Sequence, residues 1–144
     1  MIDRKYVLTL AILYMAFISP ISSAAEDTRQ LVKLPEMMQQ HMLSNMRDHL
    51  NTLNQILIYM SADELGKAAD IAEARLGMSS LTLHGASHMA KFMPKAMQDA
   101  GTNMHKAASR FALKAQEGEL KPAYKALTEV TSSCIGCHSA YRIR

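Results

Sequence analysis

The two cysteines of this chain lie close together near its end, in the stretch TSSCIGCHSAYRIR. Cys134 and Cys137 are three residues apart, and His138 follows directly. On a helix, residues at i, i+3 and i+4 lie on the same face, so this spacing places two thiols and one imidazole side by side. A disulfide across so short a loop would stabilise little of a fold. The group is therefore expected to serve a chemical purpose.

The pattern Cys-x-x-Cys-His is typical of covalent haem attachment. The two thiolates add to the vinyl groups of the porphyrin, and the neighbouring imidazole binds the iron. A thioredoxin-like redox pair would instead start a helix after a strand. A structural zinc site would need a fourth ligand, which His84 or His88 could supply. We expect Cys134 and Cys137 to hold one haem c and His138 to be the proximal iron ligand, with zinc as the alternative.

The beginning of the chain has the features of a secretory signal peptide. Charged residues 3–5 precede an apolar run from Tyr6 to Ile18, and small residues 22–25 follow. A run of about 13 residues is shorter than the roughly 20 that a membrane span needs. We expect residues 1–24 to be cleaved, so that the mature domain, residues 25–144, is periplasmic and not inserted in a membrane.

The composition of the mature chain favours helix, since Ala, Leu, Met, Gln, Glu and Lys dominate and strand-like alternation is hard to find. The boundaries of the expected helices are marked by proline and glycine residues. A further boundary is marked by Ser61-Ala62-Asp63-Glu64, which has the pattern of a capping box. Four amphipathic helices with short turns predict an all-α protein, an antiparallel up-down-up-down bundle. The expected helices span about 35–59, 61–77, 94–116 and 120–141.

Each expected helix has an apolar inner face. Residues 78–93 form a long connection of unclear structure, and Gly101 could break the third helix. The inner positions are expected at Leu34, Met38, Met42, Met46, Leu50, Leu53, Leu57 and Met60 in the first helix, Leu65, Ala68, Ala69, Ala72 and Leu76 in the second, and Met97, Met104, Ala108, Phe111 and Ala115 in the third.

The end of the chain resembles the cytochrome c′ superfamily and its low-spin relatives. The resemblance rests on Cys134, Cys137, His138, Tyr141 and Arg142, and in architecture it covers the whole mature chain. It implies one haem near the C-terminus of a four-helix bundle, attached outside the cytoplasm. Arg142 is expected to contact a haem propionate or the imidazole side, with a solvated chain end as the alternative, and Tyr141 to serve packing.

A second iron ligand is expected on the first helix. In an up-down-up-down bundle the first and fourth helices are neighbours, so the start of the first helix lies beside the motif. Its segment NMRDHLNTLNQIL resembles that of the soluble b-type cytochrome with this bundle, in which the methionine after asparagine binds iron. The resemblance implies Met46 as the distal ligand. Met42, one turn earlier on the same helix, is our second choice. Methionine is also a common core filler, so packing is the alternative for each.

A His/Met-ligated haem suits a one-electron carrier. The rival function is that of a five-coordinate cytochrome c′, which binds nitric oxide or carbon monoxide. In those members a bulky apolar residue blocks the distal face, often with an arginine one turn before it. This chain departs from that pattern, since Met42 and not an arginine stands one turn before Met46. No distal acid/base pair indicates a peroxidase, and no enzyme activity is expected.

Redox proteins are the expected partners of this chain. A formal net charge of +3 with no basic run gives no indication of nucleic-acid binding. The resemblance implies that a homodimer through the first two helices can form, although no surface stripe decides it. His41, His49 and His105 are expected to be ordinary surface or bundle-edge residues.

Overall fold

A computed structural model describes residues 26–144 of the chain. The signal peptide expected at residues 1–24 lies outside these residues. Between residues 26 and 144, no helix combines the length and the apolar character that crossing a membrane requires.

The described chain is built mainly from helices, as predicted. Two short helical segments occupy the connection that sequence left unclear, and two short strands lie near the ends. In chain order the elements are β1 (Gln30–Leu31), α2 (Glu36–Ser61), α3 (Leu65–Arg75), the 3-10 helix η1 (Met78–Ser80), α4 (Ala86–Ala90), α5 (Lys95–Gln116), α6 (Leu120–Ala140) and β2 (Tyr141–Arg142).

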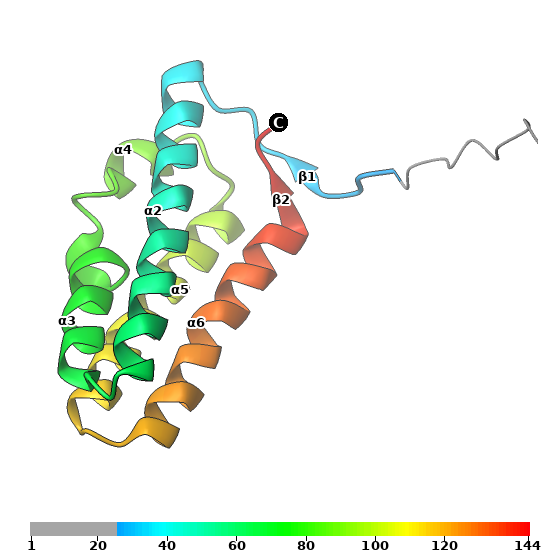
Figure 1. Ribbon diagram of the computed structural model, residues 1–144. Helices are drawn as coiled ribbons and strands as arrows, with labels where there is room; N and C mark the ends of the chain where they lie inside the picture. Colours follow the sequence, from blue (N-terminus) through cyan, green and yellow to red (C-terminus); the bar gives the residue numbers. More distant parts are fainter. Residues whose placement is uncertain (1–25) are drawn as a thin grey trace, which may run out of the picture.

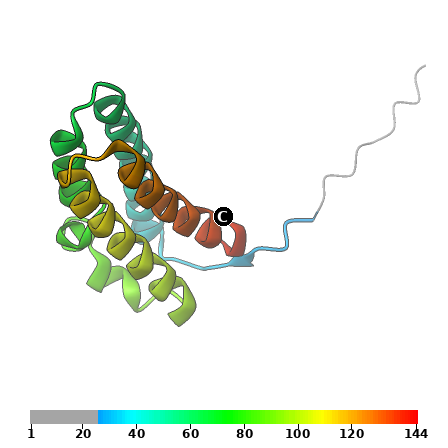
Figure 2. The same ribbon diagram turned by 90° about the horizontal axis from the view of Figure 1, so that it is seen from below.

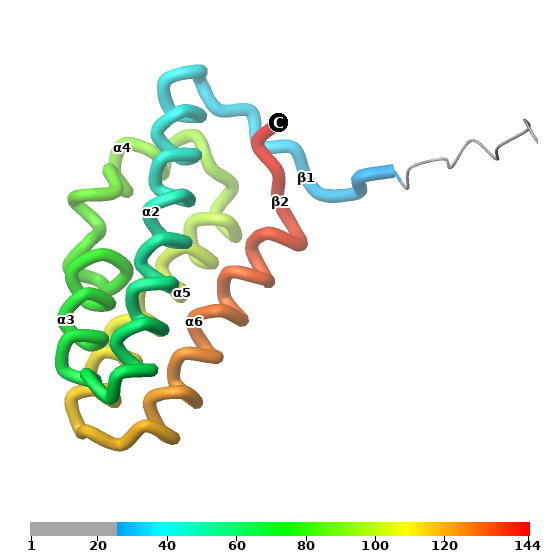
Figure 3. The backbone as a smooth tube through the Cα atoms, viewed as in Figure 1, coloured from blue at the N-terminus to red at the C-terminus, as the bar shows by residue number. Residues whose placement is uncertain are grey.

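The four long helices run alternately in opposite directions (Figures 1 and 3). Helix α3 packs against both α2 and α5, and α5 packs against α6. The first and last long helices, α2 and α6, have far fewer close backbone contacts with each other than these pairs have. The side of α2 that faces away from α3 is therefore less covered.

The core lies where α3 and α5 meet their neighbours. Small side chains let the helices approach closely, and Phe111 fills the centre with no exposed surface. The inner positions predicted for the second and third helices are confirmed as buried. The buried alanines are Ala68, Ala69 and Ala72 of α3, Ala107, Ala108, Ala112 and Ala115 of α5, and Ala123 and Ala126 of α6.

The inner face predicted for the first helix is partly wrong. Leu50 and Leu57 are 70% and 47% exposed, whereas Thr52 and Ile56 are buried. The buried stripe of α2 is centred on the side that α3 covers, and the two leucines lie outside it. Met60 is buried as predicted.

The turn between α2 and α3 also differs from prediction. Ser61 does not cap α3, because its hydroxyl donates to the Ile58 carbonyl at 2.7 Å. Glu64 precedes α3 without a side-chain capping bond and pairs with Lys67 at 2.8 Å. Asp63 has a φ of 59°, in the left-handed region. The capping box is therefore not formed.

The helix-ending role predicted for Gly118 is confirmed, whereas the break considered at Gly101 is not found. Gly118 has a φ of 79° and follows the end of α5, as the sequence predicts for a residue that can adopt the left-handed conformation. Gly101 neither breaks nor ends the helix, because α5 continues through it to Gln116.

The start and the end of the described chain pair with each other (Figure 1). Strands β1 and β2 are parallel, with Gln30 opposite Tyr141 and Leu31 opposite Arg142. Tyr141 has φ −128° and ψ 149°, so α6 ends at Ala140 and not at Tyr141 as predicted. The extended residues after α6 thereby become available for strand pairing.

Candidate functional site

The Cys-x-x-Cys-His motif lies on the last two turns of α6. The helix continues to Ala140, so Cys134, Cys137 and His138 occupy positions i, i+3 and i+4 of regular helix and share one face. Neither cysteine is in a disulfide, and both are half-buried. Cys134 packs against the hydrophobic core.

Two thiols and an imidazole remain chemically available at this site. Burial raises the pKa of both Cys134 and Cys137, so the thiols are protonated at neutral pH. His138 is exposed, and its ring forms no hydrogen bond to any residue between 26 and 144. The site therefore combines two unbridged thiols with an imidazole ring that forms no hydrogen bond within residues 26–144.

The first half of α2 lies opposite this end of α6. Gln39 donates its side-chain N–H to the Ile143 carbonyl at 2.5 Å, which ties the first turn of α2 to the chain end. Burial is the main cause that lowers the pKa of His49, and the charge of His138 adds the smallest effect. Met42 and Met46, both half-buried, lie between Gln39 and His49 on α2.

Arg142 faces an acidic residue from the beginning of the described chain. Its Nε lies 3.5 Å from Asp27 Oδ2 and is buried without a hydrogen bond to residues 26–144. Asp27 also accepts from Arg29, and this hydrogen bond is the main cause that lowers the pKa of Asp27 to about 2. The propionate contact expected for Arg142 stays a prediction.

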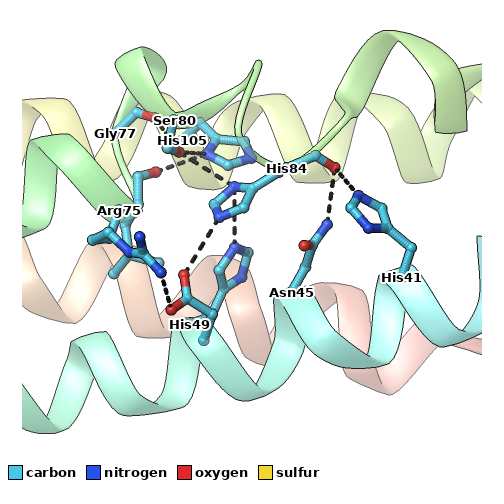
Figure 4. Close-up of polar contacts among 10 residues, drawn as sticks. His41, Asn45, His49, Arg75, Gly77, Ser80, His84 and His105 are labelled. Carbon is cyan, nitrogen blue, oxygen red and sulfur yellow. Dashed lines mark hydrogen bonds and ion pairs between the residues drawn. The ribbon is translucent and has the colours of Figure 1, made fainter.

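A second group of side chains, not predicted from sequence, lies inside the molecule. The histidine cluster consists of His49 on α2, His84 before α4, and His105 on α5, all buried (Figure 4). Their ring centroids are 4.6 to 6.0 Å apart. The expectation that His49 and His105 are surface or edge residues is wrong, because residues 78–93 fold over α2 and α5 and cover both rings.

Hydrogen bonds hold the cluster to the backbone. His105 donates from Nδ1 to the Leu76 carbonyl at 2.7 Å, which fixes its tautomer because a carbonyl only accepts. Ser80 donates to the Gly77 carbonyl at 2.7 Å, and its oxygen lies 3.3 Å from His84 Nδ1. His49 Nε2 is 3.4 Å from the same nitrogen of His84.

One ion pair borders the cluster. Arg75 donates to Asp48 Oδ1 at 2.5 Å, while Asp48 Oδ2 lies 3.7 Å from His84 Nε2. Burial raises the pKa of Asp48, but the Arg75 hydrogen bond and charge outweigh it, so the net shift is downward. Burial, followed by the nearby imidazoles, lowers the pKa of both His49 and His84. These two rings are neutral at pH 7.

The histidine cluster does not have the access that hydrolysis requires. Ser80, His84 and Asp48 follow one another as in a catalytic triad, but Ser80 is only 1% exposed and its hydroxyl donates to a backbone carbonyl. A substrate could not reach the hydroxyl in this arrangement.

The ligands considered for a zinc site do not come together. Within residues 26–144, no three His, Cys, Asp or Glu side chains are placed to hold one metal ion. His84 lies in the buried cluster, whereas His88 is exposed on α4. The structure therefore does not bring this pair to the cysteines.

A spacing signal for the cluster exists in the sequence. His41, Asn45 and His49 recur every four residues and so lie along one face of α2. His41 and Asn45 each donate to the His84 carbonyl at 2.9 Å, and His49 contacts the His84 ring. The spacing alone does not identify His84 as the residue that all three contact.

Comparisons with protein-family models, with curated proteins and with solved structures gave no match.

Proposed function

We propose that the mature chain is a periplasmic monohaem c-type cytochrome, an antiparallel four-helix bundle that carries single electrons between redox proteins. The observation that carries this proposal is the pair of unbridged thiols beside His138 on one face of α6. Cysteine and histidine in this spacing are the groups that covalent haem attachment uses.

The described residues fit a haem at this site. Cys134 and Cys137 are reduced, and the His138 ring is free of protein hydrogen bonds within residues 26–144. The Nε of Arg142 is buried, has no hydrogen bond there and already lies 3.5 Å from the Asp27 carboxylate, so it is placed to attract a second carboxylate such as a propionate. Leu50, exposed on α2, suits an apolar macrocycle.

The position of Met46 along α2 favours it as the distal ligand. We compare how far each candidate and His138 lie, along their own chain segments, from the contact between Gln39 and Ile143. From Ile143 back to His138 the chain covers about 13 Å, three extended steps and two helical ones. From Gln39, which contacts Ile143, the distance along α2 is about 10 Å to Met46 and about 6 Å less to Met42. The next turn carries His49, whose Nε2 is turned to His84. Met46 therefore lies closest to the level of His138 among the methionines considered.

Each residue has a distinct role in the proposed carrier. Cys134 and Cys137 would hold the group covalently, while His138 and Met46 would supply the two protein ligands to its iron. When bound, haem supplies an iron that gains and loses one electron. Because both ligands are held on helices, little rearrangement of the protein would be needed when the group gains or loses an electron. Apolar groups around a bound haem would limit its contact with water, which helps to set the potential.

The test is whether haem becomes covalently attached to these cysteines. The full chain is produced in a bacterial host that matures c-type cytochromes, and its optical spectrum and intact mass are measured. We expect a red protein that retains one haem under denaturing acid extraction. The double variant Cys134→Ser, Cys137→Ser should lose it, whereas Ser133→Ala, adjacent to the motif, should not. A colourless wild-type protein with unmodified cysteines would contradict the proposal, and bound zinc would favour the alternative.

A further inference from the structure

The end of α6 is linked to α2 by the two ends of the described chain. The two helices share few close backbone contacts. Figures 1 and 2 show the first described residues crossing the end of α6 before they continue into α2. We call residues 27–32 the N-terminal strap.

Backbone pairing anchors the strap to the residues after the motif. Its strand β1 pairs with β2, and the Val32 N–H donates to the Arg142 carbonyl at 2.8 Å. Val32 is 3% exposed, so its side chain is fixed by packing as well. On the other side, Gln39 of α2 holds the Ile143 carbonyl. The tail after α6 is thus held from both the strap and α2.

Charged side chains of the strap reach the motif itself. Arg29 donates from Nη1 to the His138 carbonyl at 3.4 Å. The last carbonyls of a helix lack intrahelical partners, and a cation there is favourable. Asp27 Oδ2 accepts from Arg29 at 2.7 Å and lies 3.5 Å from Arg142 Nε. Asp27 therefore contacts two arginines, Arg29 of the strap and Arg142 of the tail.

We propose that the N-terminal strap is a positioning element, which holds the last turn of α6, and with it His138, at a fixed separation from Met46 on α2. This inference rests on the proposed function. Asp27 and Arg29 would touch neither iron nor haem; they act through the His138 carbonyl and Arg142.

A ligand at this place needs such support. His138 is two residues before the end of α6, and helix ends fray. A binding site functions only when its groups are held within roughly 0.5 Å of the required geometry by a supporting shell. Without the strap, the ligand-bearing turn would be held mainly through the packing of α6 on α5.

The test compares two exposed ion pairs in the haem-loaded protein. The double variant Asp27→Asn, Arg29→Ala removes the strap charges, and Lys114→Ala removes the Lys114–Glu117 pair of similar exposure, which lies at the far end of α5. Hydrogen exchange at residues 139–144 and the ferric EPR spectrum are recorded. For the strap variant we expect exchange about tenfold faster and a second iron population with altered ligation. The control should match the wild type. Arg29→Lys, which keeps the cation, should retain most of the wild-type hydrogen exchange and EPR spectrum.

The possible outcomes distinguish a failure of the positioning role from a failure of the cytochrome proposal. A red strap variant with a wild-type EPR spectrum overturns the positioning role and leaves the cytochrome proposal intact, whether or not hydrogen exchange changes. A colourless wild-type protein overturns both. An altered spectrum with unchanged far-UV circular dichroism supports the strap, because a general loss of structure would change both.

Discussion

His49 lies beside two other imidazoles, those of His84 and His105, and is almost out of contact with water. Burial first, and then the neighbouring His84 and His105, lower its pKa to about 4. The pKa of His84 is also lowered, by burial and His105, although Asp48 opposes the shift. In the folded protein both imidazole rings are therefore neutral at pH 7, and protonating them is unfavourable.

The molecule should lose stability in mild acid for this reason. An unfolded histidine has a pKa of about 6.5, so between pH 6.5 and about 4 the unfolded chain binds more protons than the folded one. The contribution of His49 is fully present above pH 6.5 and is lost as the pH falls through this window. It amounts to roughly 3 kcal/mol at most.

Urea unfolding at pH 7.5 and pH 5 measures this effect. The wild type should have a clearly lower free energy of unfolding at pH 5, and His49→Gln should show a smaller difference between the two pH values. His88→Gln, at an exposed histidine of α4, should keep the wild-type difference. Equal wild-type stability at both pH values would show that the cluster is not the acid-sensitive part.

Prediction at the residue scale succeeds where the partners are close in sequence. The spacing of Cys134, Cys137 and His138 needs only a helix to bring them onto one face, and α6 provides it. His49 meets His84 across 35 residues of chain. That contact depends on how residues 78–93 fold over α2, which no local pattern specifies.

At the scale of elements, close packing through alanine should make α3 intolerant of larger side chains. Ala72 has no exposed surface and belongs to the core that α3 shares with α2 and α5. Ala72→Leu should destabilise the fold by about 1–3 kcal/mol through overpacking. Thermal unfolding checks this, with Ala74→Leu on the exposed side of the same helix as control. Equal melting temperatures for the two variants would contradict the packing described here.

Helix boundaries followed local chemistry only in part. Pro94 precedes α5, and Gly118, with its positive φ, follows it, as expected from the restricted and the permissive backbone of these residues. The expected capping box failed because the Ser61 hydroxyl instead donates to a carbonyl of its own helix. A serine can satisfy either partner, and the sequence does not decide between them.

At the scale of the whole molecule, α2 and α6 share few close backbone contacts, although the Cys-x-x-Cys-His motif lies on α6. The order of the helices predicts that the two are antiparallel neighbours. It does not predict that they share few close contacts, or that the strap links them. These features depend on pairing between residues 30–31 and 141–142, more than 100 positions apart, for which neither short segment has a strong strand pattern.

The proposed coordination is tested most directly by the ferric and ferrous optical and EPR spectra of the haem-loaded protein, beside Met46→Ala and Met42→Ala. We predict a low-spin ferric iron with a methionine-to-iron charge-transfer band that is lost in Met46→Ala and retained in Met42→Ala. Both residues are half-buried on α2, so the two variants are matched in size and setting. A high-spin spectrum unchanged by either substitution would contradict the Met46 ligand and favour a gas-binding, five-coordinate protein.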